Sequence, residues 1–314
     1  MSKNKTPNPP TERLQKVMAS AGLGSRRALE KRIEKGEVLV NGNPATLGWT
    51  VSVKDTIEFE QTRWAVVSQD LQQRSLIYNK PEGEVTSRTD PDGRPTVFDR
   101  LPNVRNARWI SVGRLDINTT GLLLLTTDGE LAHAMMHPSS NVDREYACRI
   151  RGLPTAEQLE ALRQGVQLAD GEARFSDIQE AGGTGENHWY HVTIMEGRNR
   201  EVRRLWESQG LLVSRLKRVR YGAVFLPKRL RMGEFSEITA REHEILREDV
   251  GLPATSSGLA LKFVSGPGKK KAAKRPGKRP PAAKRATTTQ AVTKKTGPKK
   301  PGGKKPYQKK SPRR

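Results

Sequence analysis

The chain has 314 residues, with 57 Lys or Arg against 34 Asp or Glu, and its single cysteine is Cys148. This length allows two or three compact units with a sizeable core. One cysteine excludes an internal disulfide and a metal site of several thiolates, and no apolar run approaches the roughly 20 residues of a membrane span. Since residues 1–12 also lack the apolar segment of a secretion signal, we expect a cytoplasmic protein without a membrane partner.

The positive charge is concentrated at one end of the chain. Residues 266–314 hold 19 of the 57 Lys and Arg and no Asp or Glu, so residues 1–265 carry 38 basic and 34 acidic residues, a net charge of +4. Lys-Lys and Lys-Arg pairs separated by Pro, Gly, Ala and Thr cannot bury enough apolar surface to fold. We therefore expect a disordered basic tail over residues 252–314, and disorder also in residues 1–10. The tail favours a polyanion such as nucleic acid as its partner, with a solubility tail as the alternative.

Residues 11–62 have the pattern of a small separate unit. We expect a helix over 12–21, a second helix over 25–35 with Ser25 as its N-cap, and a strand that enters the turn Asn41-Gly42, a strong hairpin signal. The second helix carries several cations at spacings that bring them onto one side, namely Arg26, Arg27, Lys31, Arg32 and Lys35. An amphipathic helix pair with a solvated basic side explains this pattern too.

A polar connector over residues 63–74 is expected to lead into a second domain over residues 75–251. Strand patterns in that domain cover 76–80, 109–112, 122–127, 145–150 and 189–195, and helix patterns cover 129–136, 156–164 and 200–209. Thr155 and Gln158 form a capping box before one of these helices. Because strands and helices do not alternate strictly, we predict an α+β fold whose larger domain is mixed, with a mainly antiparallel sheet rather than a doubly wound one.

Asp116 is the residue at which we first expect chemistry. It lies between the apolar runs 108–112 and 122–125, flanked by Gly113 and Gly121, which let the backbone come close to a ligand. A carboxylate at the rim of a sheet is placed to attack an electrophile. A surface turn capped by Asp and Asn explains the same residues equally well.

Two later segments supply further candidates. Tyr146 lies on the apolar face of a strand over residues 143–150, although packing alone would bury a tyrosine there. Arg200, Arg203 and Arg204 form a cationic row on the helix that opens after Gly197, and a solvated basic face explains that row as well.

The sequence does not favour a metal site. His133 and His137 have the i,i+4 spacing of a metal-binding pair, but no third ligand and no HExxH pattern accompanies them. We therefore expect no metal.

The first unit resembles the S4 domain, a small RNA-binding module. The matching residues are Arg13-Leu14-x-Lys16, Gly24-Ser25-Arg26-Arg27, Ile33 and Gly36-x-Val38-x-Val40-Asn41-Gly42. The resemblance implies that the two helices present basic residues to structured RNA. Arg13, Lys16, Arg26 and Arg27 are then the expected phosphate contacts.

Residues 11 to about 250 together resemble the RsuA/RluB/RluE/RluF family of pseudouridine synthases. The most specific motif is Gly113-Arg114-Leu115-Asp116 followed by Asn118-Thr119-x-Gly121-Leu122-Leu123-Leu124-Leu125-Thr126-Thr127-Asp128-Gly129. The further matches are Asn79-Lys80-Pro81-x-Gly83, Arg144-Glu145-Tyr146 and Arg198-x-Arg200-x-Val202-Arg203-Arg204-Leu205. The runs 92–99, 196–206 and 219–222 look most like those of the members that act on large-subunit ribosomal RNA.

The resemblance implies a role for each matched residue. Asp116 would be the nucleophile, Tyr146 would stack on or deprotonate the uracil, Arg203 would pair with Asp116, and Leu205 would pack beside the base. A guanidinium next to a carboxylate favours the ionised form that a nucleophile needs. The implied RNA contacts of this domain are Lys80, Arg114, Arg200 and Arg204. The implied isomerisation requires no cofactor, which agrees with the lack of a Gly-rich nucleotide-binding loop in the sequence.

The implied substrate is one uridine in a stem-loop of 23S ribosomal RNA, at position 2605 of that RNA. The partner would be 23S rRNA or the assembling large ribosomal subunit, and we expect a monomer. The main alternative is a catalytically silent RNA-binding or ribosome-assembly factor, and a weaker one is a glycosidase that releases free uracil. The basic residues suit all three, but only the enzymes need Asp116.

Overall fold

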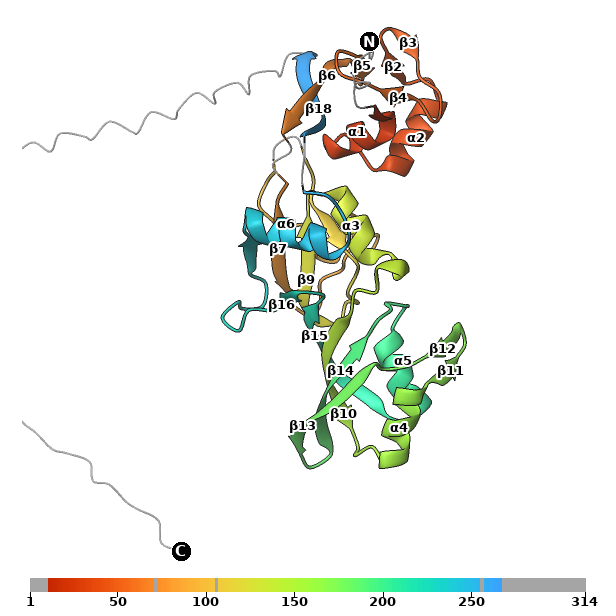
Figure 1. Cartoon of the computed structure of the whole chain (residues 1–314), viewed down its shortest axis with the longest axis vertical. Coiled ribbons are helices and arrows are strands. Elements are labelled where there is room, and N and C mark those ends of the chain that lie inside the picture. The colour runs from red at the N-terminus through yellow and green to blue at the C-terminus, as the bar shows by residue number, and fades with distance from the viewer. Residues whose placement is uncertain (1–10, 71–72, 105–106, 255–256, 267–314) are drawn as a thin grey trace, which may run out of the picture. The chain divides into compact units, whose positions relative to one another are not determined.

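A computed structural model describes residues 11–70, 73–104, 107–254 and 257–266. The predicted disordered N-terminus at 1–10 and most of the predicted basic tail, residues 267–314, lie outside the described residues. The α+β class predicted from the sequence is confirmed: a small helix-and-sheet unit is followed by a larger domain with a mixed sheet (Figure 1).

The N-terminal unit packs two helices against a small sheet. Its elements are β1 (Glu12–Arg13), α1 (Leu14–Ser20), α2 (Arg26–Glu34), β2 (Val38–Val40), β3 (Asn43–Pro44), β4 (Thr50–Val51) and β5 (Thr56–Phe59). The Ser25 side chain accepts a hydrogen bond from the Ala28 amide, as expected of an N-cap. Asn41 and Gly42 both have positive φ between β2 and β3, which is the backbone that the predicted Asn-Gly hairpin turn requires.

Two strands of this sheet contradict the predicted domain division. β6 (Thr62–Asp70) occupies the expected connector, and β18 (Ser257–Ser265), placed by sequence in the disordered tail, pairs with β6 along its length. Leu259 and Leu261 of β18 are buried in the same core as Val66. Their spacing of two residues places both side chains on the face of the strand that meets this core. The composition of the basic residues that follow masked this short apolar segment.

The larger domain is built on one sheet with the strand order β13-β14-β10-β15-β9-β7-β17. Its strands are β7 (Ser75–Lys80), β8 (Ile110–Val112), β9 (Thr120–Thr126), β10 (Arg144–Arg151), β13 (Asp177–Thr184), β14 (Asn187–Ile194), β15 (Leu212–Tyr221), β16 (Val224–Phe225) and β17 (Phe235–Ile238). Among its described strands, β9 and β15 form the one parallel pair, so the predicted antiparallel character is confirmed.

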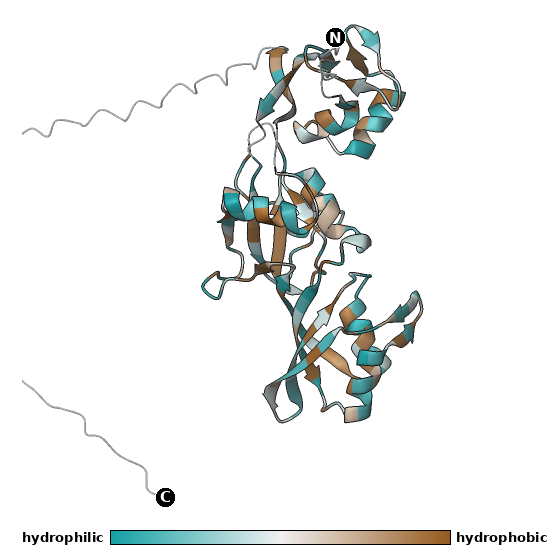
Figure 2. Cartoon of the chain, in the orientation of Figure 1, coloured by the Kyte–Doolittle hydropathy of each residue, from teal (hydrophilic) through white to brown (hydrophobic). Residues whose placement is uncertain are grey.

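Helices cover the two halves of this sheet separately. The helices are α3 (Gly129–Met136), η1 (Pro138–Ser140), α4 (Ala156–Gln164), α5 (Glu201–Ser208) and α6 (Ala240–Asp249), and β11 (Val166–Leu168) with β12 (Gly171–Ala173) forms a small hairpin. α4 and α5 pack on β10, β14 and β15, whereas α3 and α6 pack beside β9 (Figure 1). The four leucines of β9 are fully buried, and hydrophobic colour is concentrated on these central strands in Figure 2.

Gly121 lies where the two halves of the sheet meet, at the parallel pair of β9 and β15. It faces Arg218 across the β9–β15 pair with a φ of +96°, and a Cβ at this position would collide with the Arg218 carbonyl oxygen. We expect Gly121→Ala to lower the free energy of unfolding by about 3 kcal/mol, measured by urea denaturation. Gly210→Ala is the control, because Gly210 also has positive φ (+73°) but a Cβ added there would meet no atom within 4 Å. Equal losses in both variants would rule out the collision as the cause.

A buried polar network fixes the start of α3. The Asp128 carboxylate caps the helix at the amides of Glu130 and Leu131, binds the Arg247 guanidinium, and lies 3.4 Å from Nε2 of His243. Burial would raise the pKa of Asp128, but the nearby His243, the hydrogen bond from the Leu131 amide and the Arg247 guanidinium outweigh it and hold the pKa at about 2.

This depressed pKa predicts a pH dependence of stability. Asp128 stabilises the fold above its ordinary pKa of 3.8, and that contribution, about 2 kcal/mol, is lost as the pH falls towards 2. Urea unfolding of the original protein and of Asp128→Asn should therefore differ most near pH 6, and the difference should shrink by about 2 kcal/mol at acidic pH. A constant difference across this range would contradict the assignment.

Candidate active site

Asp116 lies in the connection between β8 and β9. Gly113, with a φ of +74°, turns the chain out of β8, and the Thr119 amide closes a turn onto the Asp116 carbonyl at 3.0 Å. The Asp116 side chain is half-buried, and among the described residues its carboxylate has no hydrogen-bond donor and no ion-pair partner. The sequence placed a reactive carboxylate at the rim of the sheet, and this one is accessible and unpaired.

Every carbonyl of this loop from residue 115 to 119 is held by a hydrogen bond. The donors come from separate parts of the chain: the Thr86 hydroxyl to Leu115, Lys80 Nζ to Asp116 and Thr119, the Gly83 amide to Ile117, and Arg203 Nη2 to Asn118. A loop with all of its acceptors occupied holds its side chains in fixed positions.

Lys80 is the centre of this network and is not an exposed RNA contact. Its side chain has no solvent exposure, and Nζ lies 3.0 Å from the Asp116 carbonyl, 2.9 Å from that of Thr119 and 3.0 Å from that of Pro81. Burial lowers the pKa of Lys80 to about 8, although the carboxylates of Glu84, Asp116 and Glu82 oppose the shift. The predicted RNA-binding role of Lys80 is therefore wrong, because the ammonium group faces backbone carbonyls.

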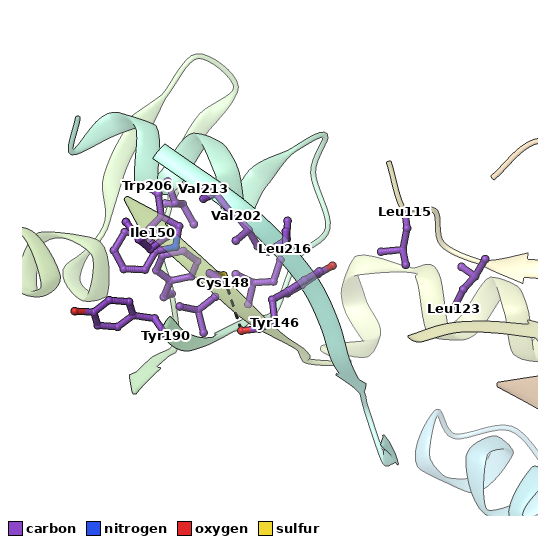
Figure 3. Close-up of a cluster of buried hydrophobic side chains, with 14 of the residues drawn as sticks. Leu115, Leu123, Tyr146, Cys148, Ile150, Tyr190, Val202, Trp206, Val213 and Leu216 are labelled. Carbon is purple, nitrogen blue, oxygen red and sulfur yellow. Dashed lines mark hydrogen bonds between the residues drawn. The ribbon is translucent and has the colours of Figure 1, made fainter. Parts of the chain in front are cut away.

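Asp116 and Tyr146 line the same cleft, of about 780 Å³. Tyr146 lies on β10 and is 8% exposed, and its hydroxyl has no hydrogen-bond partner among the described residues. Figure 3 shows Tyr146 at one end of the buried cluster on β10, with Trp206 and Tyr190 packed near Ile150 at the other end. Asp116 and Tyr146, which the sequence analysis selected as candidates, therefore line the same cleft.

Arg203 and Leu205 do not occupy the positions expected of them. Arg203 is 6% exposed and donates to the Val213 carbonyl at 2.8 Å and the Asn118 carbonyl at 3.1 Å, and the described residues contain no ion pair between it and Asp116. Burial and the neighbouring Arg200 lower the pKa of Arg203, while Asp116 opposes that shift, so the two charges still interact. Leu205 is fully buried in the core, because α5 turns it away from the cleft.

The remaining predicted contacts divide between the cleft and other surfaces. Arg114 and Arg200 line the cleft, whereas Arg204 is ion-paired with Asp170 at 2.7 Å. Sequence reasoning missed several lining residues, among them Val202, Leu216, Arg144, Arg198 and Arg218. Of these, Arg144, Arg198 and Val202 lie in the motifs that resemble the synthase family, whereas Leu216 and Arg218 lie outside them.

The four basic residues of the N-terminal unit also differ in their surroundings. Arg26 and Arg27 are exposed on α2 and have no ion-pair partner among the residues described. Arg13 donates to the Gly48 carbonyl, and Lys16 forms an ion pair with Glu12 at 2.9 Å. Arg26 and Arg27 are therefore the pair most available to an anionic ligand.

No group of three or more His, Cys, Asp or Glu in the described part of the chain is arranged to hold a metal ion. Among the helices of the same residues, none is both long and apolar enough to cross a bilayer.

Both units of this chain are similar to known protein families. Residues 74–208 match the RNA pseudouridylate synthase family, and residues 12–57 match the S4 domain. The chain is 58% identical over 267 residues to "Ribosomal large subunit pseudouridine synthase B" of Pseudomonas aeruginosa, which covers 82% of this chain and 69% of that protein. It is 54% identical over 255 residues to the protein of the same name from Salmonella typhimurium, and this match covers 80% of this chain and 88% of that protein.

Other relatives are longer, and one solved structure is similar. The match to "Ribosomal large subunit pseudouridine synthase B" of Xylella fastidiosa is 56% identical but spans about half of that protein, 52%. A solved structure described as "Crystal structure of pseudouridylate synthase" superposes with a TM-score of 0.52 at 29% identity, covering 74% of this chain and 99% of that one.

Proposed function

The chain belongs to the RNA pseudouridylate synthase family, and on that premise we propose that it isomerises a uridine of large-subunit (23S) ribosomal RNA to pseudouridine, with Asp116 as the nucleophile. The observation that carries the proposal is that Asp116 and Tyr146 line one cleft, and that neither the carboxylate nor the phenol is bonded to another described residue. The names of the relatives support large-subunit RNA as the substrate.

The reaction needs only groups that this cleft contains. A carboxylate oxygen of Asp116 bonds to ribose C1′ while the N1–C1′ bond breaks, and the bonding electron pair leaves with uracil as its anion. After the base turns, C5 bonds to C1′ and the Asp116 carboxylate is released. Tyr146 then takes the C5 proton and passes its own to solvent, while N1 takes a proton from solvent. Atoms and charge balance, and no group is transferred to another molecule.

Access to Asp116 requires the target nucleotide to leave its stack. Unstacking costs a few kcal/mol and costs less in a loop than in a duplex, which supports a stem-loop substrate. Arg26 and Arg27 on the N-terminal unit, with Arg114 and Arg200 at the cleft, can offset that cost by binding phosphates.

The finer assignments follow from the same resemblance. The target is uridine 2605 of 23S rRNA, in naked RNA or in the assembling large subunit. The protein acts as a monomer in the cytoplasm.

Pseudouridine mapping tests the proposal directly. The protein is incubated with 23S and 16S transcripts, and pseudouridine is located by chemical labelling and primer extension. We expect one new stop in 23S RNA and none in 16S RNA. RNA binding without any new stop would indicate a silent assembly factor, and release of free uracil would indicate a glycosidase.

A further inference from the structure

Arg218 is a buried arginine at the cleft whose donors are mostly unused. Its side chain is 2% exposed, yet it lines the cleft that contains Asp116 and Tyr146. Nε donates to the Leu122 carbonyl at 2.8 Å, whereas Nη2 is buried without an acceptor and Nη1 has none among the described residues. No carboxylate of the described residues pairs with it. A buried guanidinium with most of its N–H groups unsatisfied is costly unless a ligand completes it.

The sheet places this guanidinium beside the proposed reaction. Arg218 faces Tyr146 across the antiparallel β10–β15 pair, so both side chains leave the sheet on the same side. On its other side Arg218 faces Gly121, which has no side chain and lies five residues after Asp116. The arginine therefore lies between the phenol and the loop that carries the carboxylate.

The guanidinium is also fixed in orientation. The guanidinium carbon of Arg218 lies 5.0 Å from the centre of the Tyr221 ring, and that of Arg144 lies 4.8 Å from the same ring. With the Leu122 contact, this stacking defines which way the remaining donors point. Preorganised donors stabilise charge with little reorganisation when it develops.

We propose that Arg218 donates hydrogen bonds to a carbonyl oxygen of the flipped-out uracil and stabilises the negative charge that this base carries after the N1–C1′ bond breaks. The inference rests on the proposed function. A guanidinium has donors only, and the uracil anion has only acceptors at O2 and O4, over which its charge is spread. A backbone phosphate is the less suited ligand. Arg218 lies beside Tyr146, and the proposed reaction places the uracil base, not a phosphate, next to that phenol.

A rate measurement tests the charge stabilisation. At saturating RNA, Arg218→Gln should form pseudouridine about 100-fold more slowly than the unaltered protein in single-turnover assays. Arg215→Gln is the matched control, since Arg215 is exposed on the same strand and the charge change is identical. Arg218→Lys, which keeps the charge, should recover part of the rate. A loss below about threefold in Arg218→Gln would refute the role in the reaction.

A binding cycle separates contact with the base from a structural effect. Asp116→Asn proteins with and without Arg218→Gln are titrated with stem-loop RNA that carries either the target uridine or an abasic residue there. Removing the base should weaken binding about tenfold with Arg218 and about threefold without it.

Each alternative predicts a different pattern in this cycle. Equal losses from base removal in both proteins would overturn the inference and leave the proposed function intact. If Arg218 binds a backbone phosphate, Arg218→Gln would weaken binding of the uridine RNA and of the abasic RNA to the same extent. Absence of pseudouridine with the unaltered protein, by contrast, would refute the proposed function itself.

Discussion

Asp116→Asn is expected to bind its RNA within about threefold of the unaltered protein but to form pseudouridine at least about 10⁴-fold more slowly. The carboxamide has nearly the shape of the carboxylate, and the carbonyl network of the loop does not involve this side chain. It lacks, however, the anionic oxygen that attacks C1′. Filter binding and single-turnover pseudouridine mapping measure the two quantities separately.

Asp177→Asn makes the same chemical change at an exposed position on β13 and should leave both quantities unaltered. If Asp116→Asn kept more than about a tenth of the rate, the nucleophile would have to be another residue.

Lys80→Met is expected to reduce the rate about 100-fold while changing the free energy of unfolding by only about 1 kcal/mol. Methionine fills the buried space but leaves the carbonyls of Asp116 and Thr119 without their shared donor, so the loop relaxes. A shift of about 1 Å in a nucleophile can cost two orders of magnitude.

The small effect on stability has its own cause. The pKa of Lys80 is lowered to about 8 by burial, so keeping the ammonium charged in this position already costs free energy. Removing that cost partly compensates the lost hydrogen bonds. Lys228→Met, at an exposed position, is the control. A fall in stability of several kcal/mol, with the rate unchanged in the folded fraction, would show that Lys80 serves the fold and not the loop geometry.

The sequence predicted the local structure well because local signals determine it. Ser25, the Asn41-Gly42 turn and the Thr155–Gln158 capping box act within a few residues, and each has the geometry expected of it. The helix expected at 200–209 is observed at Glu201–Ser208. The strand β18 was missed because its partner, β6, lies far earlier in the chain: Ser257 pairs with Asp70 and Ser265 pairs with Arg63.

The site was predicted only where its residues carry chemistry of their own. Asp116 and Tyr146 could be chosen by residue type, and they do share a cleft. Lys80 resembled a surface cation because its acceptors are backbone atoms, two of which lie 36 and 39 residues away, and no side-chain pattern reveals them. The partner of Arg203 and the position of Arg218 likewise depend on which strands become neighbours.

The parallel contact between β9 and β15 has a consequence for how this catalytic centre could diversify. The acid is carried by the strand pair β8–β9 and the phenol by β10, and only two residue pairs, Lys217–Thr120 and Arg218–Gly121, join the strands between them. A short joint transmits any local change in twist directly to the distance from carboxylate to phenol. Substitutions at Thr120 or Lys217 of this joint should therefore change which nucleotides fit, with both reactive groups and Arg218 left in place.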